Sequence, residues 1–234
     1  MLGLGANIAM SDRLFSLNDI SDLSLYLKNG VGVHRSQWND SSGNGNHASQ
    51  ATEGNQATVS RGGLDFELDE GDHYDLTEEI TITTGQGFTL FVVCNLESTA
   101  VNATILSKAN TQHFLEFMSG ADKIRLRLAS TNTIVEPDTA NLFAAGTTFL
   151  LTIVRKSGVT GNIHIYLDGE ELDQDAQAAN PGDAEYSIVG ARNSAGSEDR
   201  FLDGSIYELA FYEKALDGVE LTNVHSYLNN KHGL

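Results

Sequence analysis

One short turn of the sequence gathers residue types that bind a hard divalent cation. Asp40, Asn44 and Asn46 follow Trp38 in the run Trp-Asn-Asp-Ser-Ser-Gly-Asn-Gly-Asn. Calcium takes about six to eight oxygen ligands from carboxylates, side-chain amides and loop carbonyls, and glycines let a loop turn its carbonyls inward. In the alternative interpretation, the Asp and Asn side chains hydrogen-bond their own turn. The pattern therefore predicts either a calcium site or a self-bonded turn.

Other catalytic and metal chemistries lack their residue patterns. The seven histidines show no paired ligand spacing, and the single cysteine, Cys94, excludes an intrachain disulfide. Cys94 lies in the apolar run 91–94, which predicts a buried, unreactive thiol. No Gly-x-Ser-x-Gly motif occurs, and Gly3-Leu4-Gly5 lacks the third glycine of a dinucleotide-binding loop. We therefore expect no enzyme, and calcium as the one cofactor worth testing.

The net charge restricts the partners of the chain. With 14 basic and 32 acidic residues, the formal net charge is −18. Such a field repels phosphate backbones and anionic lipid, so we expect neither nucleic acid nor a membrane as a partner. No run approaches the roughly 18 apolar residues of a membrane span. Residues 1–13 have no basic segment before their apolar patch, so we expect no signal peptide.

The elements that must position these residues are short strands. Apolar residues alternate in 123–128, as in a half-buried strand, whereas 88–95 and 149–155 are nearly continuous apolar runs, as in strands covered on both faces. Asp168-Gly169 predicts a type I′ turn between two strands. The predicted strands also include 63–68, 104–106, 114–118, 163–167, 170–172, 186–189 and 206–212.

A helix is predicted at the C-terminus, and an arm at the N-terminus. Asp217 and Glu220 have the spacing of a capping box, and Gly233 is placed to end the helix. Three apolar residues between them have helical spacing: Leu221, Val224 and Leu228. The apolar residues of 1–20 follow neither the helical nor the strand period for any length. We expect an arm that orders against a neighbouring subunit, or, alternatively, one that packs along its own domain.

Together these elements predict an all-β jelly-roll sandwich with one C-terminal helix, formed by a single domain at 21–234. Two segments carry information beyond this pattern of strands and helix. The run 38–48, with the apolar stretch 23–27 before it and 63–66 and 72–76 after it, resembles the opening of laminin-G-like domains in the concanavalin A-like lectin and glucanase superfamily. The segment 204–234 is similar to the closing strand, turn and terminal helix of that family.

The resemblance has consequences for both candidate chemistries. It implies that the two ends of the chain lie near each other, so Glu208 could join Asp40, Asn44 and Asn46 around calcium. The sequence departs from the family at two places. Lys28-Asn29 stands where an acidic residue often follows the opening apolar stretch, and Tyr207 stands where many relatives carry Asp. Glucanases of the superfamily carry Glu-x-Asp-x-Glu or Glu-x-Asp-x-x-Glu along one strand, and 67–72 comes near that pattern. This segment also reads as an acidic turn between two strands, so we expect no glycosidase activity.

Two functions remain open at this point. The first is a structural or adhesive virion protein of a tailed bacteriophage, made in the host cytoplasm. It would occupy the head, tail or baseplate and contact other virion proteins, copies of itself or a host-surface glycan. The start Met-Leu-Gly-Leu-Gly, which resembles small virion proteins of marine phages, favours this function. The alternative is a free bacterial carbohydrate-binding module or lectin.

Overall fold

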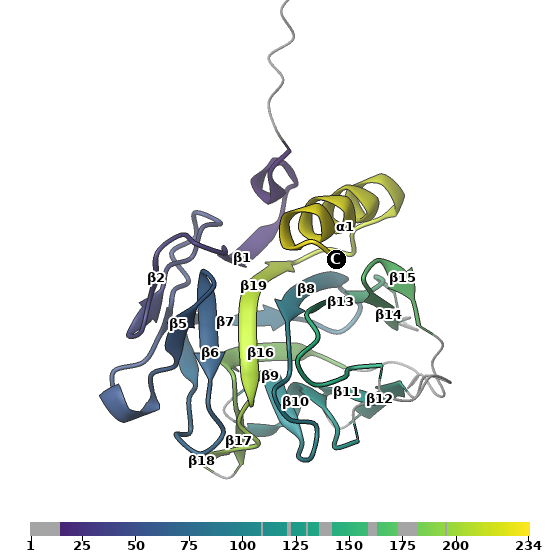
Figure 1. Cartoon of the computed structure of the whole chain (residues 1–234). Helices are drawn as coiled ribbons and strands as arrows, with labels where there is room; N and C mark the ends of the chain where they lie inside the picture. Colours follow the sequence, from purple (N-terminus) through teal and green to yellow (C-terminus); the bar gives the residue numbers. More distant parts are fainter. Residues whose placement is uncertain are drawn as a thin grey trace, which may run out of the picture.

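The protein is a sandwich of two antiparallel sheets with a helix outside one of them (Figure 1). The computed structural model describes residues 15–108, 110–120, 123–129, 131–135, 142–158, 163–172, 182–194 and 196–234. This architecture confirms the predicted all-β jelly-roll fold. Within the described residues, no helix has both the length and the apolar character needed to cross a membrane.

In the part of the chain that the structure describes, the first sheet has eight strands. These are β1 (Leu23–Leu27), β5 (Thr58–Ser60), β6 (Gly63–Phe66), β8 (Phe88–Cys94), β13 (Phe149–Arg155), β14 (Ile163–Leu167), β15 (Glu170–Glu171) and β19 (Gly204–Tyr212). Their order is β15-β14-β13-β8-β19-β6-β5, and β1 also pairs with β19. Every residue of β8, β13 and β19 is buried. The prediction that 88–95 and 149–155 are covered on both faces is therefore confirmed.

The second sheet has nine strands among the described residues. These are β2 (Val33–His34), β3 (Gln37–Trp38), β4 (Ala48–Ser49), β7 (Tyr74–Ile82), β9 (Ala103–Lys108), β10 (Asn110–Phe117), β11 (Ile124–Leu128), β12 (Thr131–Val135) and β16 (Ala184–Val189). Their order is β12-β11-β10-β9-β16-β7-β4-β3-β2. A separate hairpin, β17 (Arg192–Ser194) with β18 (Ser197–Asp199), contacts β9 and β10.

Two hydrophobic clusters hold these layers together. The larger fills the space between the sheets and includes Trp38, Phe117 and Phe211. The smaller lies on the other side of the eight-stranded sheet, under helix α1 (Gly218–His232) and the 3-10 turn η1 (Leu17–Asp19). This second cluster explains why the central strands of that sheet are apolar on both faces.

The ends of α1 differ in how well the sequence predicts them. Gly233 ends the helix in the left-handed conformation (φ 73°), as expected. Asp217 is the N-cap residue, but its side chain makes no capping hydrogen bond. The predicted capping box is therefore wrong: Glu220 instead accepts a hydrogen bond from Nζ of Lys214 at 2.9 Å. A charged donor beside the helix start outcompetes a neutral backbone N–H for the carboxylate.

The predicted arm is partly described. Residues 15–20 pack on the chain's own domain: Leu17 is fully buried, Ile20 is nearly so, and the Tyr212 hydroxyl donates to the Leu17 carbonyl at 2.9 Å. Residues 1–14 lie outside the described residues. The docking of an arm on a neighbouring subunit stays a prediction, and now concerns 1–14.

Candidate functional site

The predicted cation-binding turn is a closed hydrogen-bond network around Asp40. Its Oδ1 accepts from the backbone N–H of Tyr26 at 2.9 Å and of Ser42 at 2.8 Å. Its Oδ2 accepts from the Ser42 hydroxyl at 2.7 Å and from the Asn46 N–H at 3.1 Å. Both carboxylate oxygens thus carry two hydrogen bonds each, which fills their ordinary capacity.

Asn44 and Asn46 tie this turn to both sheets. Nδ2 of Asn44 donates to the carbonyls of Leu23 at 2.8 Å and Ser24 at 3.2 Å. Oδ1 of Asn46 accepts from the N–H of Glu78, in β7, at 2.8 Å. Because β1 belongs to one sheet and β7 to the other, the turn joins the two layers along one side of the sandwich.

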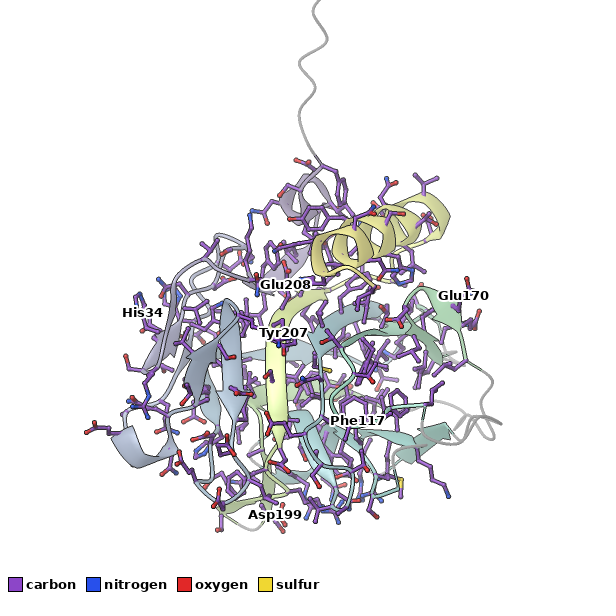
Figure 2. The ribbon with its side chains drawn as sticks, in the orientation of Figure 1. His34, Phe117, Glu170, Asp199, Tyr207 and Glu208 are labelled. Atoms are coloured by element: carbon purple, nitrogen blue, oxygen red, sulfur yellow. The ribbon has the colours of Figure 1, made fainter. Side chains whose placement is uncertain are left out.

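Glu208 has a different set of partners. This residue is 1% exposed and lies in β19 beneath α1 (Figure 2). Its carboxylate binds Nζ of Lys231 at 2.7 and 2.9 Å, Nε2 of His232 at 2.6 Å and the Tyr26 hydroxyl. Burial by itself raises the pKa of Glu208, but the hydrogen bonds from His232, Lys231 and Tyr26 outweigh it and hold the pKa below its ordinary value. Glu208 is therefore an ionised anchor for the end of α1.

The structure thus brings Asp40, Asn44 and Asn46 together and gives Glu208 partners of its own. Calcium at the turn would have to displace several of the hydrogen bonds to Asp40, so the donor set fits the ion poorly as it stands. The calcium site stays a prediction. A surface cavity of about 310 Å³ adjoins the turn and is lined by Asn44 and Asn46. Four acidic residues also line it: Asp22, Glu78, Glu79 and Glu213.

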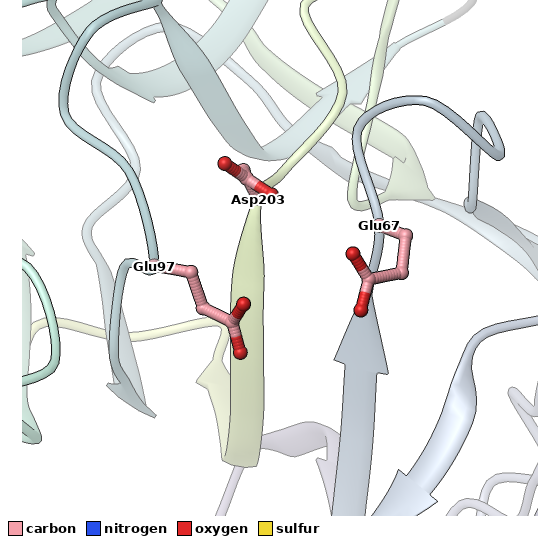
Figure 3. A group of neighbouring side chains, drawn as sticks. All are labelled: Glu67, Glu97 and Asp203. Carbon is pink, nitrogen blue, oxygen red and sulfur yellow. The ribbon is translucent and has the colours of Figure 1, made fainter.

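A second group of carboxylates was not anticipated from sequence. Glu67, Glu97 and Asp203 each bring a carboxylate oxygen within 4.8 Å of the others (Figure 3). Burial, then the neighbouring carboxylates Glu97 and Asp65, raise the pKa of Glu67 above its usual range, and the pKa of Glu97 is raised in the same way. The three residues come from distant parts of the chain, so no motif marks them.

The glucanase-like segment 67–72 is a connection and not a strand. It lies between β6 and β7, and Oδ2 of Asp72 accepts from the N–H of Glu67 at 2.9 Å. Its acidic residues therefore do not line up along one strand, as the glucanase pattern requires. The expectation that the chain is not an enzyme stays a prediction.

Two residues of types that can bind a ligand or react, Trp38 and Cys94, are part of the core. Trp38 is 1% exposed, and its indole N–H donates to the Lys28 carbonyl at 3.1 Å, so the indole cannot serve as a sugar-stacking platform. Cys94 is fully buried in β8, and burial raises the pKa of its thiol well above the ordinary value. The predicted burial of Cys94 is confirmed, and Trp38 is a packed part of the core.

Sequence comparison agrees with this fold. The family model described as "Concanavalin A-like lectin/glucanases superfamily", a laminin-G-like family, matches residues 68–222. Because the match spans more than half of the chain, the protein belongs to this family, as the opening and closing segments predicted. No curated protein sequence matches the chain.

Solved structures show the same fold. The binding domain of Paraclostridial Mosquitocidal Protein 1 has a TM-score of 0.64 and 15% identity, over 92% of this chain and 54% of that one. The binding domain of botulinum neurotoxin DC, solved in complex with rat synaptotagmin II, has a TM-score of 0.56 and 18% identity, over 91% of this chain and 52% of that one. Trypanosoma rangeli sialidase in complex with sialic acid has a TM-score of 0.58 and 16% identity, over 91% of this chain and 33% of that one. The chain thus spans a third to a half of these proteins, and the likeness establishes a lectin-like fold.

Proposed function

We propose that this chain is a non-catalytic binding module that contacts a host-surface glycan through the outward face of its nine-stranded sheet. The outward face is the side of that sheet that points away from the eight-stranded sheet. In the proposed setting, the module is a structural or adhesive component of a tailed-phage particle.

A difference between the two sheets carries this proposal. The central strands of the eight-stranded sheet are buried throughout, because α1 and η1 cover them. In the nine-stranded sheet, β11 alternates buried and half-buried residues, and β7 alternates buried and exposed ones. The outward face is therefore polar along β11 and β7, whereas β9 is almost wholly buried and β9 and β10 contact the β17–β18 hairpin. Polar positions fixed by a sheet suit recognition of an extended polar ligand.

Side chains on this face are held in place by ion pairs. Nζ of Lys108 lies 3.1 Å from the carboxylate of Glu79 and also forms an ion pair with that of Glu185. Such preorganised polar groups lose little conformational entropy when a ligand binds, which supports a binding role for this face.

Two further points support the setting. The start Met-Leu-Gly-Leu-Gly resembles small virion proteins of marine phages. Binding domains of toxins are among the proteins of the same fold, and one of these was solved in complex with rat synaptotagmin II, which supports a binding role. Other virion proteins, or copies of this chain, would then be the assembly partners. The alternative, a free bacterial carbohydrate-binding module, uses the same face.

A glycan array with the purified chain tests the binding function. Binding of the retained glycans is then measured for three variants. Thr81→Trp on β7 and Arg127→Trp on β11 place bulk on the outward face, and Val219→Trp on α1 is the control. Val219 is 74% exposed and lies on the opposite side of the sandwich. We expect at least one face variant to abolish retention and Val219→Trp to preserve it. Retention that only Val219→Trp abolishes contradicts the proposal.

Mass spectrometry of purified phage particles tests the setting. We expect the chain at a fixed copy number relative to the known particle proteins. A chain found free of particles, with glycan binding intact, would support the bacterial carbohydrate-binding module instead.

A further inference from the structure

Four arginines gather at one end of the outward face. Arg125 and Arg127 come from β11, Arg192 from β17, and Arg200 directly follows β18. The guanidinium carbons of Arg125, Arg127 and Arg192 lie 5.2, 5.9 and 5.7 Å from the ring centroid of Phe114. Phe114 is itself 1% exposed, so the ring is enclosed by these groups. Cation–π contacts of this kind fix the positions of the guanidinium groups.

Carboxylates neutralise this arginine cluster only in part. The buried carboxylate of Glu116 binds Arg125, and both of its oxygens accept from Nη1 of Arg200 at 2.8 Å. Arg192 makes a bidentate pair with Asp199, at 2.7 and 2.6 Å. Three arginines thus share two carboxylates.

Arg127 has no carboxylate partner among the described residues. Its Nε donates to the Ala129 carbonyl at 3.3 Å, which leaves the outer N–H groups of the guanidinium available. One more carboxylate belongs to the neighbouring hairpin, that of Glu198, and it accepts from the Asn193 amide at 2.9 Å. Among the described residues, four arginines oppose three carboxylates even with Glu198 counted. The cluster is a local positive surplus in a chain whose net charge is −18.

The cluster also has hydrogen-bonding capacity that its own residues do not use. Nε of Arg125 and the Thr104 hydroxyl are buried without a hydrogen-bond partner among the described residues. Thr104 pairs with Glu116 in the register of β9 and β10, and its N–H donates to the Arg200 carbonyl at 3.0 Å. It therefore lies within the same cluster. Both atoms are enclosed, so a ligand would reach them only after a side-chain shift. The donors open to a ligand are the outer N–H groups of half-buried Arg127.

From this arrangement we propose that the arginine cluster binds the carboxylate or sulfate group of an acidic glycan. The inference rests on the proposed function and specifies its ligand class. Arginine forks match the geometry of such oxyanions and hold them bidentately. The acidic remainder of the protein repels long, uniformly charged polymers such as nucleic acids, so a single anionic sugar among neutral ones suits the surface better.

Calorimetric titration of the full chain tests the inference. The probes are dextran oligosaccharides that carry a single uronate for a carboxylate or a single sulfate group, and neutral dextran of the same length, at low and at physiological salt. We expect one or both anionic glycans to bind, more weakly as salt rises, and neutral dextran not to bind at the cluster. Arg127→Gln is the variant of choice, because it leaves the pairs of buried Glu116 intact.

We expect Arg127→Gln to weaken binding about tenfold or more, and Arg127→Lys to restore it only in part, since lysine keeps the charge but not the fork. Lys156→Gln, at an exposed position just after β13, is the charge-matched control and should bind as the parent does. An equal loss in both variants would show general electrostatics and overturn the inference. Polyglutamate bound as tightly as either glycan would overturn it as well.

The remaining outcomes separate this inference from the proposed function. Neutral glycans bound on the outward face, with no effect of Arg127→Gln, would refute the anionic ligand and leave the binding function standing. Failure of every glycan on the array and in the titrations would refute both.

Discussion

Lys231, in the last turn of α1, donates hydrogen bonds through Nζ to both carboxylate oxygens of Glu208, at 2.9 and 2.7 Å. Glu208 lies in β19 and is 1% exposed, and the same carboxylate binds His232 and the hydroxyl of Tyr26 in β1. One buried charge therefore ties the C-terminal helix to two strands of the eight-stranded sheet.

Glu208→Gln should lower the free energy of unfolding by roughly 2–4 kcal/mol at pH 7, because it leaves Lys231 and His232 without their buried counter-charge. The pKa of Glu208 is held below its ordinary value, so its contribution is present above that value and is lost as the pH falls through the folded-state pKa. We expect the difference in the free energy of unfolding between Glu208→Gln and the parent to shrink below about pH 4.

Urea unfolding at several pH values measures this effect. Glu220→Gln is the control, because Glu220 pairs with Lys214 at a more exposed position, and it should change stability by less than about 1 kcal/mol. Equal stability of Glu208→Gln and the parent at pH 7 would show that the buried pair contributes nothing.

His225 predicts a second, separate pH dependence. Burial lowers its pKa to about 4, and its Nε2 lies 3.1 Å from the Thr152 hydroxyl. The unfolded chain takes up a proton near the ordinary value of 6.5 while the folded chain does not, so stability falls as the pH drops from about 6.5 to about 4. The loss attributable to His225 is roughly 3 kcal/mol.

His225→Gln should remove that part of the pH profile, because the amide can still reach Thr152 but does not titrate. Melting curves of the parent and the variant between pH 4 and 7 measure the difference. His34→Gln, on exposed β2, is the matched control and should follow the parent curve. Parallel profiles for His225→Gln and the parent would contradict the prediction.

Calcium at the Asp40–Asn46 turn remains a prediction with a simple measurement. Binding to the folded state raises the melting temperature by mass action, so millimolar calcium should stabilise the chain relative to chelator. Asn44→Ala, at an exposed position of the turn, should remove the shift, whereas Glu97→Gln in the separate carboxylate group should keep it. Identical melting temperatures in calcium and chelator would show that no site exists.

Two N-terminal deletions separate folding from assembly. Removal of residues 1–14 should leave stability unchanged but prevent incorporation into particles, if 1–14 docks on a neighbouring subunit. Removal of 1–20 also deletes Leu17 and Ile20 from the cluster under α1, at a cost of about 2 kcal/mol per buried side chain. Incorporation of the shorter deletion at the normal copy number would end the docking prediction.

We expect no glycosidase activity on a panel of β-glucans. The acidic residues of 67–72 lie in a connection between β6 and β7 and do not share one strand face. Release of reducing sugar, measured with and without Glu67→Gln, is the readout. Sustained turnover that Glu67→Gln abolishes would make the chain an enzyme.

Local periodicity in the sequence determined much of the fold. Alternation in β11 and unbroken apolar runs in β8 and β13 indicated how many faces of each strand are covered, because successive side chains point to opposite sides. The dipeptide Asp168-Gly169 indicated its hairpin, since both residues adopt positive φ, at 51° and 96°. These features depend only on neighbouring residues, so the sequence carries them directly.

Tertiary structure decided which side chains meet. Phe114, Arg127 and Arg192 converge because β11 pairs with β10 while the β17–β18 hairpin, much later in the chain, packs against β10. Glu67, Glu97 and Asp203 meet in the same way, from three distant connections. Period-two patterns assign a residue to a face but do not say which strands are neighbours. For that reason the arginine cluster, the carboxylate group and the partners of Glu208 appear only when the sheets are assembled.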